Sequence, residues 1–160
     1  MVLGLKSRNE ILMRFDGPLD ARKVVKKIKR KFWFDKRVHE WEVLAPFRFY
    51  FDDENPERFI QVDAGWRTDL ASVPGIFGFV IQKDGIWSQA AVTHDWSYKN
   101  RGDVVYIEKK GKLIKQNPLS RKEQDRAFEN GMQTLGTNLP TRFIMFRAVR
   151  RFGFISYPKK

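Results

Sequence analysis

The sequence contains no cysteine, few acidic residues and no long apolar run. The absence of cysteine excludes a disulfide framework and any metal site built from thiolates. No stretch reaches the roughly 18 consecutive apolar residues of a membrane span. Residues 1–10 lack the apolar core of a signal peptide. These absences predict a soluble protein without a transmembrane segment, made in the cytoplasm.

The shortage of acidic residues leaves the chain strongly basic. It has 31 Lys and Arg against 19 Asp and Glu, which gives a formal net charge of +12. Seven of the basic residues lie in residues 22–31, and five more lie in residues 147–160. A positive field attracts nucleic acid, anionic lipid and acidic protein surfaces alike, so charge alone does not choose among these partners.

Length and composition predict one globular domain over residues 1–160. Hydrophobic residues make up 42% of the chain and aromatic residues 14%, which suffices for a packed core. We divide this domain into a basic N-terminal segment at about residues 18–36 and a core carrying the sequence motifs at about residues 38–153.

The first half of the chain has the period-two pattern of strands. Residues 11–15 predict a short strand, and residues 38–69 alternate between apolar and polar side chains, with residues 59–66 as the returning strand of an antiparallel pair. The basic segment allows two structures. Asp20 can cap a helix with apolar residues at every fourth position, whereas a β-ribbon is the alternative.

The second half predicts about three helices. The first covers residues 87–99, and a small hairpin around Gly111 follows. Ser120 and Glu123 have capping-box spacing and open the second helix. The third runs from Pro140 to Gly153 and is apolar on most sides, which predicts a central position or contact with a partner. The fold class is therefore α+β, a small antiparallel sheet from the N-terminal half packed with these helices.

Two of the predicted helices carry an ionisable residue inside an apolar stripe. On the first, Trp87, Ala91, His94 and Tyr98 share one face, and on the second Asp125 interrupts an apolar face. If the two helices pack together, the imidazole of His94 meets the carboxylate of Asp125. A carboxylate beside an imidazole fixes its tautomer and raises its basicity, so that His94 can act as a general base.

Two further carboxylates extend this hypothesis to a metal ion. Asp95 and Asp69 are candidate oxygen ligands for Ca²⁺ or Mg²⁺, so the residues together predict metal-assisted hydrolysis. The alternative is that the His–Asp pair only stabilises the fold, because buried pairs of this kind are common outside active sites. Ser72 lacks the Gly-x-Ser-x-Gly turn of an exposed nucleophile and is better explained as a loop residue.

Three motifs, in this order, carry a family resemblance: GWRTDLASVPG (65–75), AAVTHDWSY (90–98) and LSRKEQDRAFENGM (119–132). Together they resemble an uncharacterised family of tailed phages and prophages, the domain of unknown function thirteen-fifty-three. The resemblance covers roughly residues 38–153. It implies a phage origin and brings no established activity.

A more distant likeness is to the phospholipase A2 motif, in which a helical His-Asp-x-x-Tyr is paired with an Asp on a second helix. This likeness implies that His94 is the base, that Asp95 binds Ca²⁺, that Asp125 orients His94 and that Tyr98 supports the site as a hydrogen-bond donor. The glycine-rich Ca²⁺ loop and the disulfides of phospholipase A2 have no counterpart in this sequence.

Three functions follow as hypotheses, with the virion or the host cytoplasm as the expected location. The leading one is a phage protein associated with the tail, baseplate or neck of the virion. Its His–Asp centre acts as, or derives from, a hydrolase directed at the cell envelope, with phospholipid or peptidoglycan as an anionic substrate. The second is a purely structural virion component bound to other phage proteins. The third is an accessory protein that binds nucleic acid nonspecifically by electrostatic attraction.

Overall fold

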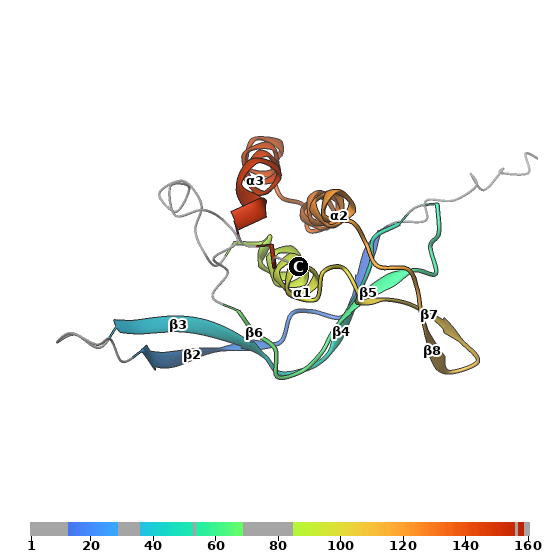
Figure 1. The fold of residues 1–160 in the computed structure, drawn as a ribbon, viewed down its shortest axis with the longest axis horizontal. Coiled ribbons are helices and arrows are strands. Elements are labelled where there is room, and N and C mark those ends of the chain that lie inside the picture. The colour runs from blue at the N-terminus through green and yellow to red at the C-terminus, as the bar shows by residue number, and fades with distance from the viewer. Residues whose placement is uncertain (1–12, 29–35, 53, 69–84, 156, 159–160) are drawn as a thin grey trace, which may run out of the picture.

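The computed structural model describes residues 13–28, 36–52, 54–68, 85–155 and 157–158. In these residues the fold is α+β, as the sequence predicts: two antiparallel sheets and three α-helices, with the helices in the C-terminal half (Figure 1). The hairpin predicted around Gly111 belongs to the larger sheet, so the second half of the chain contributes strands as well as helices.

The larger sheet has five strands. They are β1 (Arg14–Asp16), β4 (Phe47–Tyr50), β5 (Phe59–Val62), β7 (Val105–Lys109) and β8 (Lys112–Lys115), in the spatial order β1-β4-β5-β7-β8. Every neighbouring pair is antiparallel, which confirms β5 as the returning strand that follows β4. Alternate residues of β4 are buried, because a strand directs successive side chains to opposite faces.

The smaller sheet contains the basic segment. Its strands are β2 (Ala21–Ile28), β3 (Lys36–Val43) and β6 (Arg67–Thr68), in the order β2-β3-β6. The helix predicted here is wrong, and the β-ribbon alternative is correct. A four-residue spacing of apolar side chains is also an even spacing, so it suits a strand as well as a helix. Pairing with β3 decides the outcome, because all eight residues of β2 pair with β3, and Arg22 forms a 2.7 Å ion pair with Glu42 across the strands.

The three helices begin and end near the residues that the sequence predicts. They are α1 (Ser88–Lys99), α2 (Arg121–Thr134) and α3 (Leu139–Phe152), and a 3-10 turn (Gly153–Ile155) follows α3. The capping box of Ser120 and Glu123 is present at the start of α2. Pro140 lies in the first turn of α3, where its missing N–H costs no hydrogen bond.

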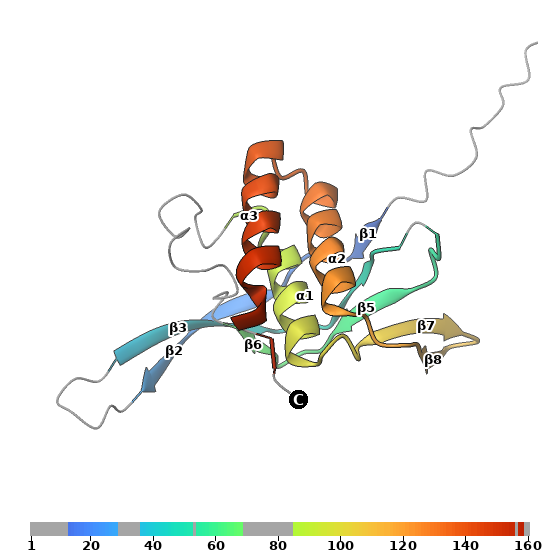
Figure 2. The same cartoon turned by 45° about the horizontal axis from the view of Figure 1, so that its top comes forward.

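The helices lie together on one side of the strands (Figures 1 and 2). α1 contacts α2 and β5, and α2 contacts α3 and β1. Phe47 and Val62 of the sheet share one apolar cluster with Phe128, Met132 and Met145 of the helices. In the same views β2 and β3 form a ribbon that extends away from the helices.

α1 is the central helix, whereas for α3 the sequence suggested either a central position or contact with a partner. Nine of the twelve residues of α1 are buried, although many of them are polar. In α3 only Met145, Ala148 and Val149 are buried, and Phe143 is 56% exposed. The prediction of a central α3 is therefore wrong, because its apolar residues surround the helix while only one side meets α2. Contact with a partner stays a prediction.

Among the described residues, no helix is long and apolar enough to cross a membrane.

Candidate functional site

The first part of the site comes from α1. Its helical repeat places His94 and Tyr98 one turn apart on the same face, with ring centroids 4.0 Å from each other. Phe128 of α2 packs against the His94 ring with a centroid distance of 4.9 Å. The stripe predicted from the sequence is buried, and its members Trp87, Ala91, His94 and Tyr98 are each at most 6% exposed.

The second part comes from α2, which places Asp125 opposite this stripe. The Nε2 atom of His94 lies 3.2 Å from Oδ1 of Asp125, and the Tyr98 hydroxyl donates a short hydrogen bond to the same oxygen. The two helices therefore bring together the three residues that the sequence proposed as catalytic. Because an ionised carboxylate only accepts hydrogen bonds, Nε2 of a neutral His94 carries the proton in this contact.

The third part comes from α3 and was not predicted. Arg150 donates a 3.0 Å hydrogen bond to Oδ2 of Asp125, and Arg121, one turn before Asp125, lies 3.7 Å from the same oxygen. Asp125 thus holds side chains from all three helices. Arg121 could have been found from its i,i+4 spacing to Asp125. Arg150 could not, because its contact depends on how α3 packs.

The protonation states follow from burial and from these contacts. Burial lowers the pKa of His94 below its ordinary value, and the hydrogen bond to Asp125 opposes that shift only in part. Burial raises the pKa of Asp125, but hydrogen bonds from His94, Tyr98 and Arg150 outweigh it and lower the pKa overall. Burial and the hydrogen bond to Asp125 raise the pKa of Tyr98. A neutral imidazole and a phenol therefore donate to an ionised carboxylate at neutral pH.

The centre is closed to solvent. The side chain of His94 is 1% exposed and that of Asp125 is 0% exposed. A general base must reach the proton that it removes, either directly or through one water molecule. In this arrangement the imidazole packs between Tyr98 and Phe128, and its Nε2 proton bonds to Asp125. The geometry supplies the predicted His–Asp contact but no access for a substrate.

A family model places this centre within a known group of proteins. The model of the family described as "Protein of unknown function (DUF1353)" matches residues 41–149, more than half of the chain. The chain belongs to this family. No curated protein and no solved structure matches it.

The DUF1353 match contains most of the centre. His94, Tyr98, Arg121 and Asp125 lie inside the matched residues, and Arg150 lies one residue beyond them. Strands β1 and β2 precede the match, so the family model does not cover the basic strand β2.

Of the two predicted metal ligands, only Asp95 lies in the described part of the chain. Asp95 accepts a 2.6 Å hydrogen bond from the hydroxyl of Thr68, which ties α1 to β6. Asp69 and Ser72 lie outside the described residues. No group of three or more His, Cys, Asp or Glu side chains among the residues described could hold a metal ion. The proposed Ca²⁺ or Mg²⁺ site stays a prediction.

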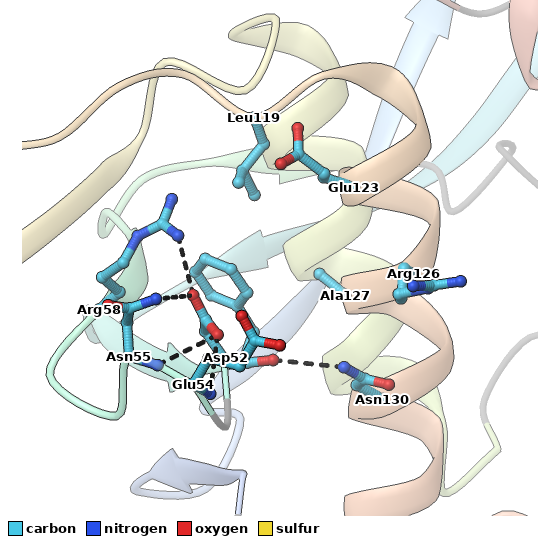
Figure 3. A pocket seen from close by; sticks show the side chains of 10 residues that line it. Asp52, Glu54, Asn55, Arg58, Leu119, Glu123, Arg126, Ala127 and Asn130 are labelled. Atoms are coloured by element: carbon cyan, nitrogen blue, oxygen red, sulfur yellow. Dashed lines mark hydrogen bonds and ion pairs between the residues drawn. The ribbon is translucent and has the colours of Figure 1, made fainter.

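A separate cavity of about 380 Å³ lies between the β4–β5 loop and α2 (Figure 3). Asp52 organises this loop by accepting hydrogen bonds from the backbone N–H groups of Glu54 and Asn55, and it forms a 2.8 Å ion pair with Arg58. Asn130 of α2 donates to the backbone carbonyl of the residue before Asp52. These contacts hold the loop against α2 and engage the side chains of Asp52, Arg58 and Asn130.

Proposed function

We propose that this protein is a structural component of a phage particle, in its tail, baseplate or neck, in which the His94–Asp125 centre stabilises the fold. The phage assignment is supported by the three sequence motifs at residues 65–75, 90–98 and 119–132, which resemble a tailed-phage family. The structural role is supported by the geometry of the centre and by the surface of α3.

The closed centre is the observation that carries this proposal. Asp125 is fully buried, and both of its oxygens accept hydrogen bonds from protein side chains. For catalysis the packing between α1, α2 and α3 would have to open, because a substrate must reach the imidazole of His94. A carboxylate with buried, satisfied contacts to three helices is suited to fixing their relative positions.

The outer side of α3 offers a surface for a neighbouring subunit. Leu139 is 69% exposed, Phe143 is 56% exposed, and Phe154 and Ile155 in the following turn are more than 60% exposed. The guanidinium of Arg147 lies over the ring of Phe143 at 5.3 Å. Exposed apolar side chains beside arginine are typical of the centres of protein interfaces.

The charge of this surface indicates the kind of partner. The chain has no acidic residue after Glu129, while α3 contains four arginines. We therefore assign this surface to an acidic, partly apolar face of another particle protein, because opposite charge favours encounter and correct register.

Mass spectrometry of purified particles tests the proposal. We expect the protein at a copy number that matches the symmetry of the tail, baseplate or neck. A Phe143→Glu variant should be incorporated much less, because it introduces a like charge against an acidic partner. A Leu44→Glu variant, altered at an exposed leucine outside α3, is the matched control. Absence of the protein from particles, or equal incorporation of both variants, contradicts the proposal.

The hydrolase hypothesis rests on the same 3.2 Å His94–Asp125 contact and is tested separately. Wild type and His94→Gln are compared on phospholipid vesicles and on purified peptidoglycan, after circular dichroism has shown that both are folded. A structural centre predicts equal background turnover in the two proteins. Turnover that His94→Gln abolishes would establish a catalytic centre instead.

A further inference from the structure

The five-stranded sheet has a face that no helix of the described chain covers (Figure 1). On β4, Phe47 and Phe49 belong to the core on the helix side, so Arg48 and Tyr50 lie on the opposite face. Antiparallel sheets commonly leave such a face to water, with polar side chains. In this sheet the face also carries aromatic rings, and exposure to water alone does not explain them.

A row of five residues, one from each strand, crosses this face. The pairing register sets Arg14 opposite Tyr50, Tyr50 opposite Phe59, Phe59 opposite Tyr106, and Tyr106 opposite Lys115. The guanidinium of Arg14 lies 4.0 Å from the ring centroid of Tyr50, and the rings of Tyr50 and Phe59 are 5.2 Å apart. Such pairs stabilise the sheet, and here they form an aromatic row in which Phe59 is buried while Tyr50 and Tyr106 are partly exposed.

A groove of about 690 Å³ opens on the same face. Its lining includes Asp16, Pro46, Arg48, Gln61, Glu108 and Leu113. Arg48 forms a 2.5 Å ion pair with Glu108 across the groove, and its guanidinium lies 4.6 Å from the ring centroid of Phe59. A hollow of this size holds a small ligand, and the Arg48–Glu108 pair gives it a fixed polar wall.

Among the described residues, the polar groups of the groove keep hydrogen-bonding capacity that no neighbour uses. Glu108 binds Arg48 through Oε2, which leaves Oε1, and Gln61 donates through Nε2 to Asp63, which leaves its own oxygen. The carboxylate of Asp16 is exposed at the rim. These oxygens accept hydrogen bonds and Arg48 donates them, whereas a hydroxyl group can do both. A ligand rich in hydroxyl groups therefore matches the lining.

We propose that this groove binds a neutral oligosaccharide. Two carboxylates face one guanidinium in the lining, so the groove disfavours phosphates and other anions although the chain is basic overall. Tyr106 beside the groove is partly exposed and gives the apolar face of a sugar ring a surface to pack on, whereas the Arg14 guanidinium already covers one face of the Tyr50 ring. This proposal does not depend on the role in a particle, because a glycan site would serve any protein with this fold.

Titration with chitotetraose and with maltotetraose, followed by NMR, tests the proposal. We expect the ring signals of Tyr106 to shift at millimolar concentrations of one of these sugars. Asp16→Ala and Gln61→Ala should each weaken binding about threefold to tenfold, since each removes a hydrogen-bonding group. Glu57→Ala, which removes an exposed carboxylate in the β4–β5 turn, is the matched control and should bind as wild type does.

Two results overturn the proposal. One is the absence of any shift with both sugars at about 10 mM. The dissociation constant would then lie well above this concentration, which is too weak for recognition. The other is equal affinity in wild type, Asp16→Ala and Gln61→Ala, which places the sugar elsewhere. A thymidine oligonucleotide of about 15 bases serves as a competing probe. If it binds the groove more tightly than the sugars, and addition of salt weakens that binding, the face is a nucleic-acid platform instead.

Discussion

Asp125 carries a negative charge at a position without solvent exposure, so its partners must provide the stabilisation that water would give. Asp125→Asn removes the charge but keeps the shape. It leaves Arg150 without its carboxylate partner and disturbs the contacts with His94 and Tyr98. Breaking a buried ion pair usually lowers the free energy of unfolding by about 3–5 kcal/mol. Because Arg150 is partly exposed, we expect the smaller value, about 3 kcal/mol.

Urea denaturation measures this loss. Asp103→Asn is the control, since Asp103 also pairs with a cation, Lys115, but its side chain is 51% exposed. An exposed pair of this kind contributes little to stability, because water and salt screen it. If Asp125→Asn loses no more stability than Asp103→Asn, the centre does not hold the three helices.

The lowered pKa of His94 predicts a dependence of stability on pH. Because burial favours the neutral imidazole in the folded state, the unfolded chain binds more protons once the pH falls below the ordinary His pKa of 6.5. Stability should therefore fall on acidification below about pH 6.5, by at most about 1.4 kcal/mol per pH unit for one proton. His94→Gln should lose this part of the slope.

Urea unfolding of wild type and His94→Gln, repeated between about pH 5 and pH 8, tests the sign. Asp125 does not contribute in this range, because its pKa is lowered from an ordinary value of 3.8 and its effect is lost only in stronger acid. Parallel stability curves for the two proteins would mean that His94 is not held neutral in the folded state.

The connection from α1 to α2 depends on Gly102. Its φ of +77° is a conformation that L side chains rarely adopt, and an added Cβ would lie 2.1 Å from the carbonyl oxygen of Leu119. Its N–H donates to the carbonyl of Ser97, and its own carbonyl accepts from Leu119. Gly102 therefore fixes where the chain leaves α1 and where it enters α2, which positions His94 relative to Asp125.

Gly102→Ala should cost about 3 kcal/mol or more, from the unfavourable backbone conformation and the clash together. Gly111→Ala provides the comparison, because Gly111 has a similar φ of +73° with no atom within 4 Å of the added Cβ. That variant should lose only about 1–2 kcal/mol. Thermal unfolding of both variants measures the two losses of stability. A larger loss in Gly102→Ala than in Gly111→Ala is the part caused by the clash with Leu119.

The helices and their limits could be predicted from the sequence because their signals are local. Ser120 and Glu123 satisfy backbone groups within one turn, and Pro140 needs only the first turn of its own helix. For β2 the apolar spacing fits both periods, so the sequence leaves a helix and a β-ribbon open, and the deciding partner, β3, lies further along the chain. Local patterns thus define an element where its stabilising groups are close in sequence.

The centre was predictable for the same reason, but only in part. His94, Tyr98 and Asp125 interrupt apolar stripes, so their convergence followed once the helices were placed together. The contact of Arg150 with Asp125 and the exposure of Leu139 and Phe143 depend on which face of α3 packs against α2. The sequence does not indicate this face, because apolar residues lie around most of the helix. The aromatic row on the sheet depends on strand register, which residue spacing alone does not determine.

The arrangement of the whole molecule separates its two candidate surfaces. α3 packs on α2 in the helix layer (Figure 1). The residues Asp16, Arg48 and Gln61 that line the groove lie on the sheet face that points away from that layer. A subunit bound to the α3 surface would therefore leave the groove open. The protein would be held in a particle by one side and present a glycan site on the other.

The net charge of +12 also acts at the scale of the molecule, and it predicts weak, nonspecific attraction to DNA. In the described part of the basic ribbon, Arg22 is paired with Glu42, and Lys23 lies over the ring of Trp41. Arg22 and Lys23 are therefore engaged by other residues of the protein. The expected attraction to DNA comes from the net positive charge of the whole chain. Binding of this kind reads no base sequence.

Fluorescence anisotropy with two unrelated duplexes of about 20 base pairs measures this attraction. We expect the two affinities to be similar and to fall about tenfold or more as salt rises from about 50 to about 200 mM, because counterions are released on binding. An affinity that salt does not change would contradict this electrostatic mechanism. A large preference for one duplex would show direct contacts to bases, and nucleic-acid recognition would then replace particle assembly as the function to pursue.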